Sequence, residues 1–341
     1  MNEKSFFLPA EWAHQWGVQL TWPHVDTDWH CYLDAITETY VEMARAISER
    51  ESLLVVAPHI IEVKQLLLSE LTAEQFNKVL FFECPTNDTW SRDHGFISLM
   101  GKDGLQLCDF RFNGWGEKFA AEKDNAVNGL LFSFLSEQFG LSDVSVTYRN
   151  DLDFVLEGGS IESDGKGTVF TTKCCLLAPH RNEPLSQFEI ENELKRRLGA
   201  ERIVWIDTSP LEGDDTDGHI DTIVRICPDD TLLFVDDDHL EQQLSQLRTL
   251  SGRPYRLIRL PQPDAIYEDG ERLPATYANF LVVNDAVLMP IYGQLEKDME
   301  AIRLVACAFP GRDIIPIDSR VIIRQHGSIH CCTMQFPSLI I

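Results

Sequence analysis

The stretch GHIDTIVRICPDDTLLFV at 218–235 shows how this chain is built. A histidine and an aspartate precede an apolar run, a turn of one proline and two aspartates, and a second apolar run. Short apolar runs bounded by turn residues predict two strands of a hairpin. Helical periodicity over 238–250 then predicts a helix, and the apolar run at 255–261 predicts a further strand. The stretch therefore predicts a strand–strand–helix–strand module.

The same order of features recurs in four other segments. They are WSRDHGFISLM at 90–100, EGGSIESDGKGTVFTT at 157–172, NFLVVNDAVLMPIYG at 279–293 and HGSIHCCTMQFP at 326–337. The leading polar residues of the five segments follow one another at intervals of 64, 62, 60 and 52 residues: Asp93, Glu157, His219, Asn279 and Cys331. A period near sixty residues indicates repetition of one supersecondary module.

A module of this size cannot bury its apolar face alone, so the modules must pack around a shared axis. Five of them closed in a ring would form an α/β propeller and gather the five leading polar residues at one end of the axis. An ordinary α/β sheet with accidental spacings is the alternative. Two acids, a base, an amide and a thiol are poor core residues, which favours the propeller. We expect one domain over 1–341.

Composition narrows the class of partner. The chain carries 29 basic and 54 acidic residues, a formal net charge of −25. A field of that sign repels polyanions and argues against nucleic acid and acidic membrane surfaces. It attracts small cationic substrates, although acidity also serves solubility alone.

The cysteines and the hydropathy indicate the compartment. Nine cysteines without a CxxC pair, in a chain of 341 residues with 44% apolar residues, predict reduced thiols rather than disulfide staples. The first residues lack the apolar stretch of a signal peptide, and no apolar run is long enough to span a membrane. We therefore expect a cytoplasmic protein that has no membrane contact.

Two segments hold carboxylates that could bind a cation. On a strand, His219 and Asp221 would project from the same face with Ile220 on the core side. An isolated pair of this kind is more often structural. Asp93 follows Trp90, whose ring could form a flat wall for a planar cation, although a purely structural loop is equally compatible with this segment.

The paired cysteines supply a candidate nucleophile. Cysteines are usually buried as small apolar side chains. Neighbours on a strand point to opposite faces, so only one of Cys331 and Cys332 can face the site. Alternation alone does not decide which of the two it is. His330 would point away from Cys331, and we expect it to be a packing or structural residue. His219 is the better base because it comes from another module.

Together these residues suit one chemistry. A guanidinium is planar and permanently charged, and two carboxylates, Asp93 and Asp221, can hold it by bidentate hydrogen bonds. Cys331 would attack the central carbon, and His219 would protonate one nitrogen so that it leaves as ammonia. Water activated by His219 would then cleave the S-alkylthiouronium intermediate. Because nearby carboxylates disfavour a thiolate, we expect the bound cation to assist ionisation of Cys331.

These motifs resemble those of the agmatine deiminase family, a branch of the guanidine-modifying enzymes that also includes bacterial peptidylarginine deiminases. The resemblance covers essentially the whole chain. It rests on LPAEW at 8–12, TWP at 21–23, NDTWSRD at 87–93, FNGWG at 112–116, EGGS at 157–160, GDDTDGHID at 213–221, YANF at 277–280 and IHC at 329–331.

The resemblance implies a five-bladed α/β propeller, the pentein fold, with no metal and no organic cofactor. It implies hydrolysis of agmatine to N-carbamoylputrescine and ammonia, a step toward putrescine. Matched by position, it implies the catalytic residues Cys331, His219, Asp93 and Asp221. It implies substrate-binding residues at Trp90, Glu157 and Asn279, with Trp115 and Asp215 toward the far end of the substrate.

The segment before the cysteine departs from the family pattern. Agmatine deiminases read GGGNIHC there, whereas this chain has Gln325-His326-Gly327-Ser328 ahead of Ile329. The group recognised at the tail of the substrate is therefore open. Deimination of peptidyl or free arginine is the second hypothesis, although free arginine needs a basic partner for its carboxylate, and these motifs offer none.

Two further alternatives come from other classes. One is a catalytically silent propeller that serves as a binding module. The other is a zinc hydrolase built on His219, Asp221 and cysteines, although the cysteines lack ligand spacing. A homodimer is the assembly that we consider.

Overall fold

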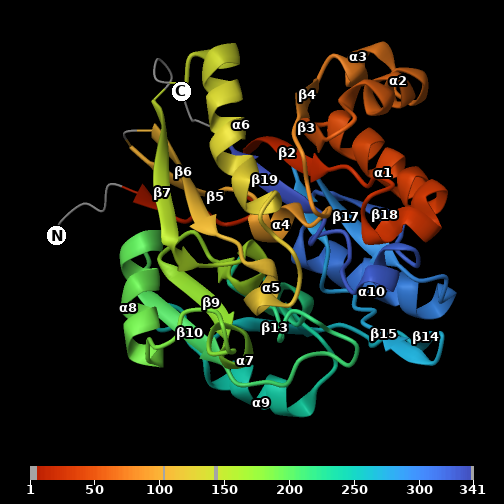
Figure 1. Cartoon of the computed structure of the whole chain (residues 1–341). Helices are drawn as coiled ribbons and strands as arrows, with labels where there is room; N and C mark the ends of the chain where they lie inside the picture. Colours follow the sequence, from red (N-terminus) through yellow and green to blue (C-terminus); the bar gives the residue numbers. More distant parts are fainter. Residues whose placement is uncertain (1–5, 103, 142–144, 339–341) are drawn as a thin grey trace. The chain divides into compact units, whose positions relative to one another are not determined.

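The computed structural model describes residues 6–102, 104–141 and 145–338 (Figure 1). The chain divides into two compact units. Unit 1 comprises Ala13–Gly158 together with both chain ends, where its C-terminal part begins at Cys331. Unit 2 comprises Phe7–Trp12 and Gly159–His330. The single domain expected over 1–341 stays a prediction.

The first sheet of unit 1 joins the two ends of the chain. Its strands are, in order, β19 (Thr333–Pro337), β2 (Gln15–Thr21), β3 (Ser52–Ala57) and β4 (Val79–Glu83). β19 pairs antiparallel with β2, and the other neighbours are parallel. The helical segments that connect them are η1 (Asp28–Tyr32), α1 (Leu33–Ser48), α2 (Ile60–Glu70) and α3 (Ala73–Phe76).

The second sheet of unit 1 contains β5 (Ile97–Gly101), β6 (Gly104–Arg111) and β7 (Val146–Val155). β5 and β6 are antiparallel, whereas β6 and β7 are parallel. The helices of this part are α4 (Ser91–His94), α5 (Gly114–Glu117) and α6 (Asp124–Phe139). Two short elements, β1 (Phe6–Phe7) and η2 (Gly158–Ser160), lie at the boundaries of the units.

Unit 2 contains three three-stranded sheets and one hairpin among its described residues. The sheets are β8 (Glu162–Ser163), β9 (Thr168–Thr172) and β10 (Arg202–Ile206); β11 (Val224–Cys227), β12 (Thr231–Phe234) and β13 (Arg256–Arg259); and β16 (Leu281–Val283), β17 (Ala286–Ile291) and β18 (Asp313–Asp318). The hairpin is β14 (Ile266–Glu268) with β15 (Glu271–Leu273). The helical segments are α7 (Lys173–Leu176), α8 (Gln187–Leu198), η3 (Ile220–Thr222), α9 (Asp238–Gln246), α10 (Leu295–Ala308) and η4 (Ile322–Gln325).

One pattern is common to all five of these larger sheets. Two antiparallel strands are followed by at least one helix and a third strand that pairs parallel with the second. In the sheet of β19, β2 and β3, the first strand comes from the C-terminus of the chain. The predicted strand–strand–helix–strand module is confirmed, and the chain has a mixed α/β fold. The helix predicted over 238–250 is α9, which ends at Gln246.

Two local predictions were wrong. His219 and Asp221 lie at the 3₁₀ helix η3, not on a strand. Cys331 and Cys332 lie in a turn directly before β19. The two-residue alternation of a strand therefore applies to neither pair.

The core of unit 1 packs α6 against its sheets. Val127 and Leu131 are four residues apart and so lie on one face of α6, where both are fully buried. They belong to one apolar cluster with Leu54 and Val56 of β3. Burial of each such side chain contributes about 1.5–3 kcal/mol. This packing fixes the frame that carries the loops ahead of β5 and β19.

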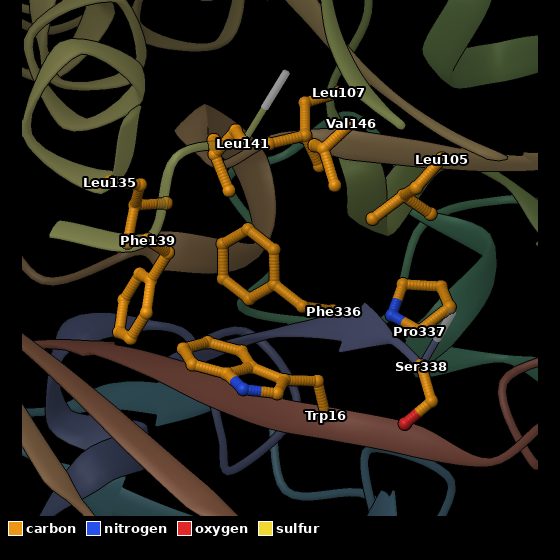
Figure 2. Close-up of a pocket in the computed structure, with 10 residues that line it drawn as sticks. All are labelled: Trp16, Leu105, Leu107, Leu135, Phe139, Leu141, Val146, Phe336, Pro337 and Ser338. Atoms are coloured by element: carbon orange, nitrogen blue, oxygen red, sulfur yellow. The ribbon is translucent and has the colours of Figure 1, made fainter. Parts of the chain in front are cut away.

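An apolar pocket of about 360 Å³ opens beside this core (Figure 2). Figure 2 shows the rings of Trp16, Phe139 and Phe336 gathered on one side of it, and edge-on contacts join Trp16 to both phenylalanines. None of the predicted site residues lines this pocket. No helix in the described part of the chain has the length and apolar character needed to span a bilayer.

Candidate active site

Five candidate residues belong to unit 1: Trp90, Asp93, Trp115, Glu157 and Cys331. All five side chains are buried, and Glu157 is completely so. Asp93 precedes β5, Glu157 precedes β8 and Cys331 precedes β19, so each leads the first strand of a module. The expected placement of these polar residues at module starts is confirmed.

Asp93 is held by a one-turn helix and an indole. Ser91 anchors α4 to β2, because its hydroxyl accepts from the backbone N–H of Thr21 at 2.9 Å and donates to the Thr21 hydroxyl at 2.8 Å. The indole N–H of Trp115 donates to Oδ2 of Asp93 at 2.9 Å. Trp115 therefore orients this carboxylate. A contact between Trp115 and the far end of a substrate stays a prediction.

The backbone of Arg92 links Asp93 to Glu157 and to Cys331. The N–H of Arg92 donates to the carbonyl oxygen of Cys331 at 3.1 Å. The carbonyl of Arg92 lies against Gly158, where an added Cβ would sit only 2.2 Å from that oxygen. Glycine is required at 158 for this close approach. The residues adjacent in sequence, Asp93 and Glu157, are thereby fixed relative to Cys331.

The two thiols at 331 and 332 have different surroundings. Complete burial is the largest influence on Cys332, and it raises the pKa of this thiol to about 12, although a hydrogen bond to Tyr40 opposes the shift. A thiol with that pKa is protonated at neutral pH and is a poor nucleophile. Cys331 is also buried, with 4% of its surface exposed. The environment of Cys332 therefore favours Cys331 as the nucleophile.

The segment ahead of Trp90 is braced by buried acids. The indole N–H of Trp29 donates to Oδ1 of Asp88 at 3.2 Å, and the Trp29 and Trp90 rings lie 5.9 Å apart. Asp124 accepts the backbone N–H of Asn87 at 2.6 Å. Burial raises the pKa of Asp88 to about 6 and that of Asp124 to about 8. This loop is a structural support for Trp90 as well as a candidate wall of the site.

Four candidates belong to unit 2: Asp215, His219, Asp221 and Asn279. His219, Asp221 and Asn279 are completely buried, whereas Asp215 is partly exposed. The backbone N–H of His219 donates to the Thr216 hydroxyl at 3.1 Å. That hydroxyl in turn donates to a carboxylate oxygen of Asp214 at 2.6 Å. The loop before His219 is therefore closed by its own polar residues.

Neighbours of Asp215 have structural partners. Asp214 also accepts the backbone N–H of Gly218 at 2.8 Å. Asp217 forms an ion pair of 2.7 Å with the fully buried guanidinium of Arg181. A Cβ at Gly218 would lie 2.6 Å from Sγ of Cys174, so the glycine before His219 serves close packing in this unit. Asp214 and Asp217 support the loop that carries Asp215.

Asp221 is held by His330, the residue that precedes Cys331. Nδ1 of His330 lies 2.7 Å from Oδ2 of Asp221, and the backbone N–H of His330 donates to the carbonyl of Asn279 at 3.2 Å. Burial alone would raise the pKa of Asp221, but the hydrogen bond from His330 and the charges of His330, His219 and Arg225 outweigh it and lower the pKa. Asp221 is therefore ionised at neutral pH.

His330 and Glu11 are functional candidates that sequence reasoning missed. His330 was expected to be a packing or structural residue, without a functional role, because alternation on a strand was assumed. Nε2 of His330 lies 2.9 Å from Oε2 of Glu11, which belongs to the LPAEW motif at 8–12. An acidic residue inside an otherwise apolar motif was the signal that could have identified Glu11.

The model of the Porphyromonas-type peptidyl-arginine deiminase family matches residues 7–337. The chain belongs to this family. The candidate residues thus place a thiol, two carboxylates and two indoles in unit 1, and an imidazole, two carboxylates and an amide in unit 2. These are the groups that recognition and hydrolysis of a guanidinium require.

Relatives of this chain include proteins with solved structures. A Porphyromonas gingivalis protein provisionally described as an arginine deiminase is 44% identical, with 98% of this chain and 99% of that chain covered and a TM-score of 0.88. A substrate-bound agmatine deiminase of C. jejuni, a cysteine-to-serine variant, is 34% identical over 98% and 96% of the chains, with a TM-score of 0.84. A Vibrio parahaemolyticus protein provisionally named agmatine deiminase is 33% identical over 98% of both chains.

One cluster in unit 2 has the composition of a metal site. Ligand atoms of Glu11, Glu162 and His330 lie within 4.8 Å of one another. The guanidinium of Arg225 already pairs with both glutamates, and its Nε lies 2.5 Å from Oε1 of Glu162. A second cation would be repelled by Arg225, so the residues fit an ion-pair network rather than a metal.

Proposed function

We propose that this chain is a hydrolase that deiminates a guanidinium substrate, and that agmatine is the substrate converted to N-carbamoylputrescine and ammonia. The observation that carries the proposal is the tie between Arg92 and Cys331. Arg92 donates a hydrogen bond to the carbonyl of Cys331 and is followed in the sequence by Asp93. The tie therefore holds the buried carboxylate of Asp93 in a fixed position relative to the turn that carries the thiol. A clamped guanidinium and a nearby thiol are the two elements that this reaction needs.

The reaction proceeds through a covalent intermediate. Asp93 and Asp221 hold the guanidinium, and the thiolate of Cys331 adds to its central carbon. Protonated His219 delivers the proton that lets one terminal nitrogen leave as ammonia when its C–N bond breaks, and an S-alkylthiouronium remains. His219 then takes a proton from water, whose oxygen adds to the same carbon. The C–S bond breaks, the thiolate of Cys331 is released, and the ureido product loses its extra proton to solvent.

Glu157, Asn279, Trp90 and Trp115 complete the proposed substrate site. Glu157 and Asn279 supply hydrogen-bonding groups from their modules, and Trp90 supplies a flat face for the planar cation. Asp215 would bind the free amine of agmatine as a carboxylate partner. The roles rest on the matched family motifs and on the burial of the first three residues.

Deimination of arginine or peptidyl-arginine is the second candidate, and one observation favours it. The relative with 44% identity is provisionally described as an arginine deiminase. The residues that differ from the family pattern are also placed close to the proposed site, because Nδ1 of His326 donates to the carbonyl of Gly213 at 2.7 Å. The segment 325–328 therefore contacts the loop that carries Asp215, where the tail of the substrate would be recognised.

A direct assay separates the two candidates. The purified protein is incubated with agmatine, free arginine or an arginine-containing peptide, and ammonia and ureido product are measured. Product from agmatine alone supports the first proposal. Product from arginine or the peptide and none from agmatine would contradict it.

We further propose that the five modules close into a five-bladed propeller over one domain. The repeated strand pairing supports this arrangement, as does a fifth module built from both chain ends. Closure would bring His219, Asp221, Asn279 and Asp215 to the residues of unit 1. An experimental structure with the thiol of Cys331 far from the imidazole of His219 would contradict the proposal.

A cytoplasmic homodimer is the setting that we propose for this activity. The free thiols of all nine cysteines, each within the described residues, are compatible with a reducing compartment. Light scattering after size exclusion measures the assembly: a mass twice that of the chain supports the dimer, and the mass of a single chain contradicts it.

A further inference from the structure

A continuous line of charged side chains is buried in unit 2. It begins at Asp221 and runs through His330, Glu11 and Arg225 to Glu162. His330 lies 2.7 Å from Asp221 and 2.9 Å from Glu11, and Arg225 pairs with both Glu11 and Glu162. Each of the five side chains is at most 9% exposed. Burial of so many charges costs folding free energy, so a buried line of five charged side chains suggests a role beyond stability.

The far end of the line is attached to the sheets. Oε2 of Glu162 accepts the backbone N–H of Ile226 at 3.0 Å, and Oε1 of Glu11 accepts that of Val282 at 3.0 Å. Arg225 donates to the carbonyl of Ala278 at 2.9 Å and covers the ring of Phe280 at 4.2 Å. These contacts join β8, β11 and β16. The line therefore rests on three strands, while its other end is Asp221.

The two contacts of His330 favour its doubly protonated form. Both ring nitrogens face carboxylate oxygens, and a carboxylate can only accept a hydrogen bond. A neutral imidazole has one N–H, so one ring lone pair would then point at a carboxylate oxygen. Only the imidazolium donates to Asp221 and Glu11 together. Its positive charge also offsets one of the three buried carboxylates of the line.

We propose that His330 is a positioning residue that acts through Asp221, and that Glu11 holds His330 in place. As an imidazolium locked between two carboxylates, His330 fixes the orientation of the Asp221 carboxylate and keeps it ionised to receive a guanidinium. This inference rests on the proposed function, because it assigns Asp221 to the substrate. It also gives the LPAEW motif at 8–12 a role, since Glu11 is its acid.

Two substitutions separate the two hydrogen bonds of His330. In His330→Asn the side-chain amide nitrogen takes nearly the place of Nδ1, so the bond to Asp221 is kept and the bond to Glu11 is lost. In His330→Gln the amide nitrogen takes nearly the place of Nε2, so the bond to Glu11 is kept and the bond to Asp221 is lost. His239→Asn and His239→Gln, on the exposed surface of α9 in the same unit, are the controls.

Steady-state kinetics and melting temperatures are measured for all four variants and the unsubstituted protein. We expect kcat/KM to fall roughly hundredfold in His330→Gln, because a displacement of about 1 Å at a substrate clamp costs on that order. The fall should be at least tenfold smaller in His330→Asn, while the two variants melt at similar temperatures. Equal losses in both, or none in either, would overturn the inference.

A second readout does not depend on turnover. Proton and nitrogen NMR of histidine-labelled protein at neutral pH reports whether the His330 ring carries one or two protons, with His330→Asn identifying the signal. Two protons support the inference, and a single neutral tautomer overturns it. If the unsubstituted protein converts no guanidino compound, the proposed function fails while the NMR result still decides the state of His330.

Discussion

Substitution of Gly158 by alanine should impair the site without touching any catalytic group. An alanine Cβ would lie 2.2 Å from the carbonyl oxygen of Arg92 and 2.7 Å from Cε of Met334, and real Cβ atoms are essentially never closer than 3.0 Å to a neighbour. The Met334 side chain can turn away, but the Arg92 backbone must move by about 1 Å. Forcing such a shift in a packed interior costs about 1–3 kcal/mol of unfolding free energy.

The same shift should reach the thiol and both acids. Arg92 holds the Cys331 carbonyl through its N–H, Asp93 is the next residue in sequence, and Glu157 precedes the substituted position. A misplacement of about 1 Å costs on the order of a hundredfold in rate, so we expect kcat/KM for agmatine to fall about that much in Gly158→Ala.

Chemical denaturation and steady-state kinetics test this prediction together. Gly129→Ala is the matched control, because a Cβ at this position in α6 meets no atom within 4 Å. The control should gain up to about 1 kcal/mol from helix propensity and keep its activity. Gly158→Ala with unchanged kcat/KM would refute the idea that Arg92 coordinates the acids and the thiol.

Three other perturbations follow from the unit 1 geometry. Cys331→Ala should fold and lose all turnover, whereas Cys332→Ala should keep most of it and lose about 1–2 kcal/mol of stability; the reverse activities would mean that Cys332 is the nucleophile. Trp115→Phe removes a hydrogen bond to the Asp93 carboxylate worth about 1.5–3 kcal/mol, so kcat/KM should fall roughly 10- to 100-fold, and an unaltered value would contradict an orienting role. Burial raises the pKa of Asp124 from 3.8 to about 8, so the folded state holds a proton that the unfolded chain releases between these values. The unfolding free energy should therefore fall as pH rises through this window, by at most about 1.4 kcal/mol per unit, and Asp124→Asn should remove that dependence; parallel pH profiles for the two proteins would exclude it.

Module architecture was predictable from the sequence because it depends on local signals. Apolar runs, turn residues and helical periodicity repeat at an interval near sixty residues, and each determines an element through short-range contacts. Asp229 and Asp230 illustrate this, since both adopt positive φ in the turn that was expected between β11 and β12.

The environment of the candidate residues was harder to predict, because it depends on contacts between distant segments. The 3₁₀ turn at His219 and Asp221 replaces an expected strand, since Thr222 bonds back to the His219 carbonyl at 2.8 Å. Nothing in the sequence around His330 indicates that its second ring nitrogen contacts the carboxylate of Glu11, which lies more than three hundred residues earlier. The LPAEW motif identified the segment but not its partner.

The most direct test is the mass of the peptide that carries Cys331 after the enzyme is mixed with agmatine and quenched rapidly in acid. The account predicts a transient adduct on this peptide equal to agmatine minus ammonia, absent in Cys331→Ala. Product formation with no adduct at Cys331, or with the adduct on another cysteine, would contradict the account.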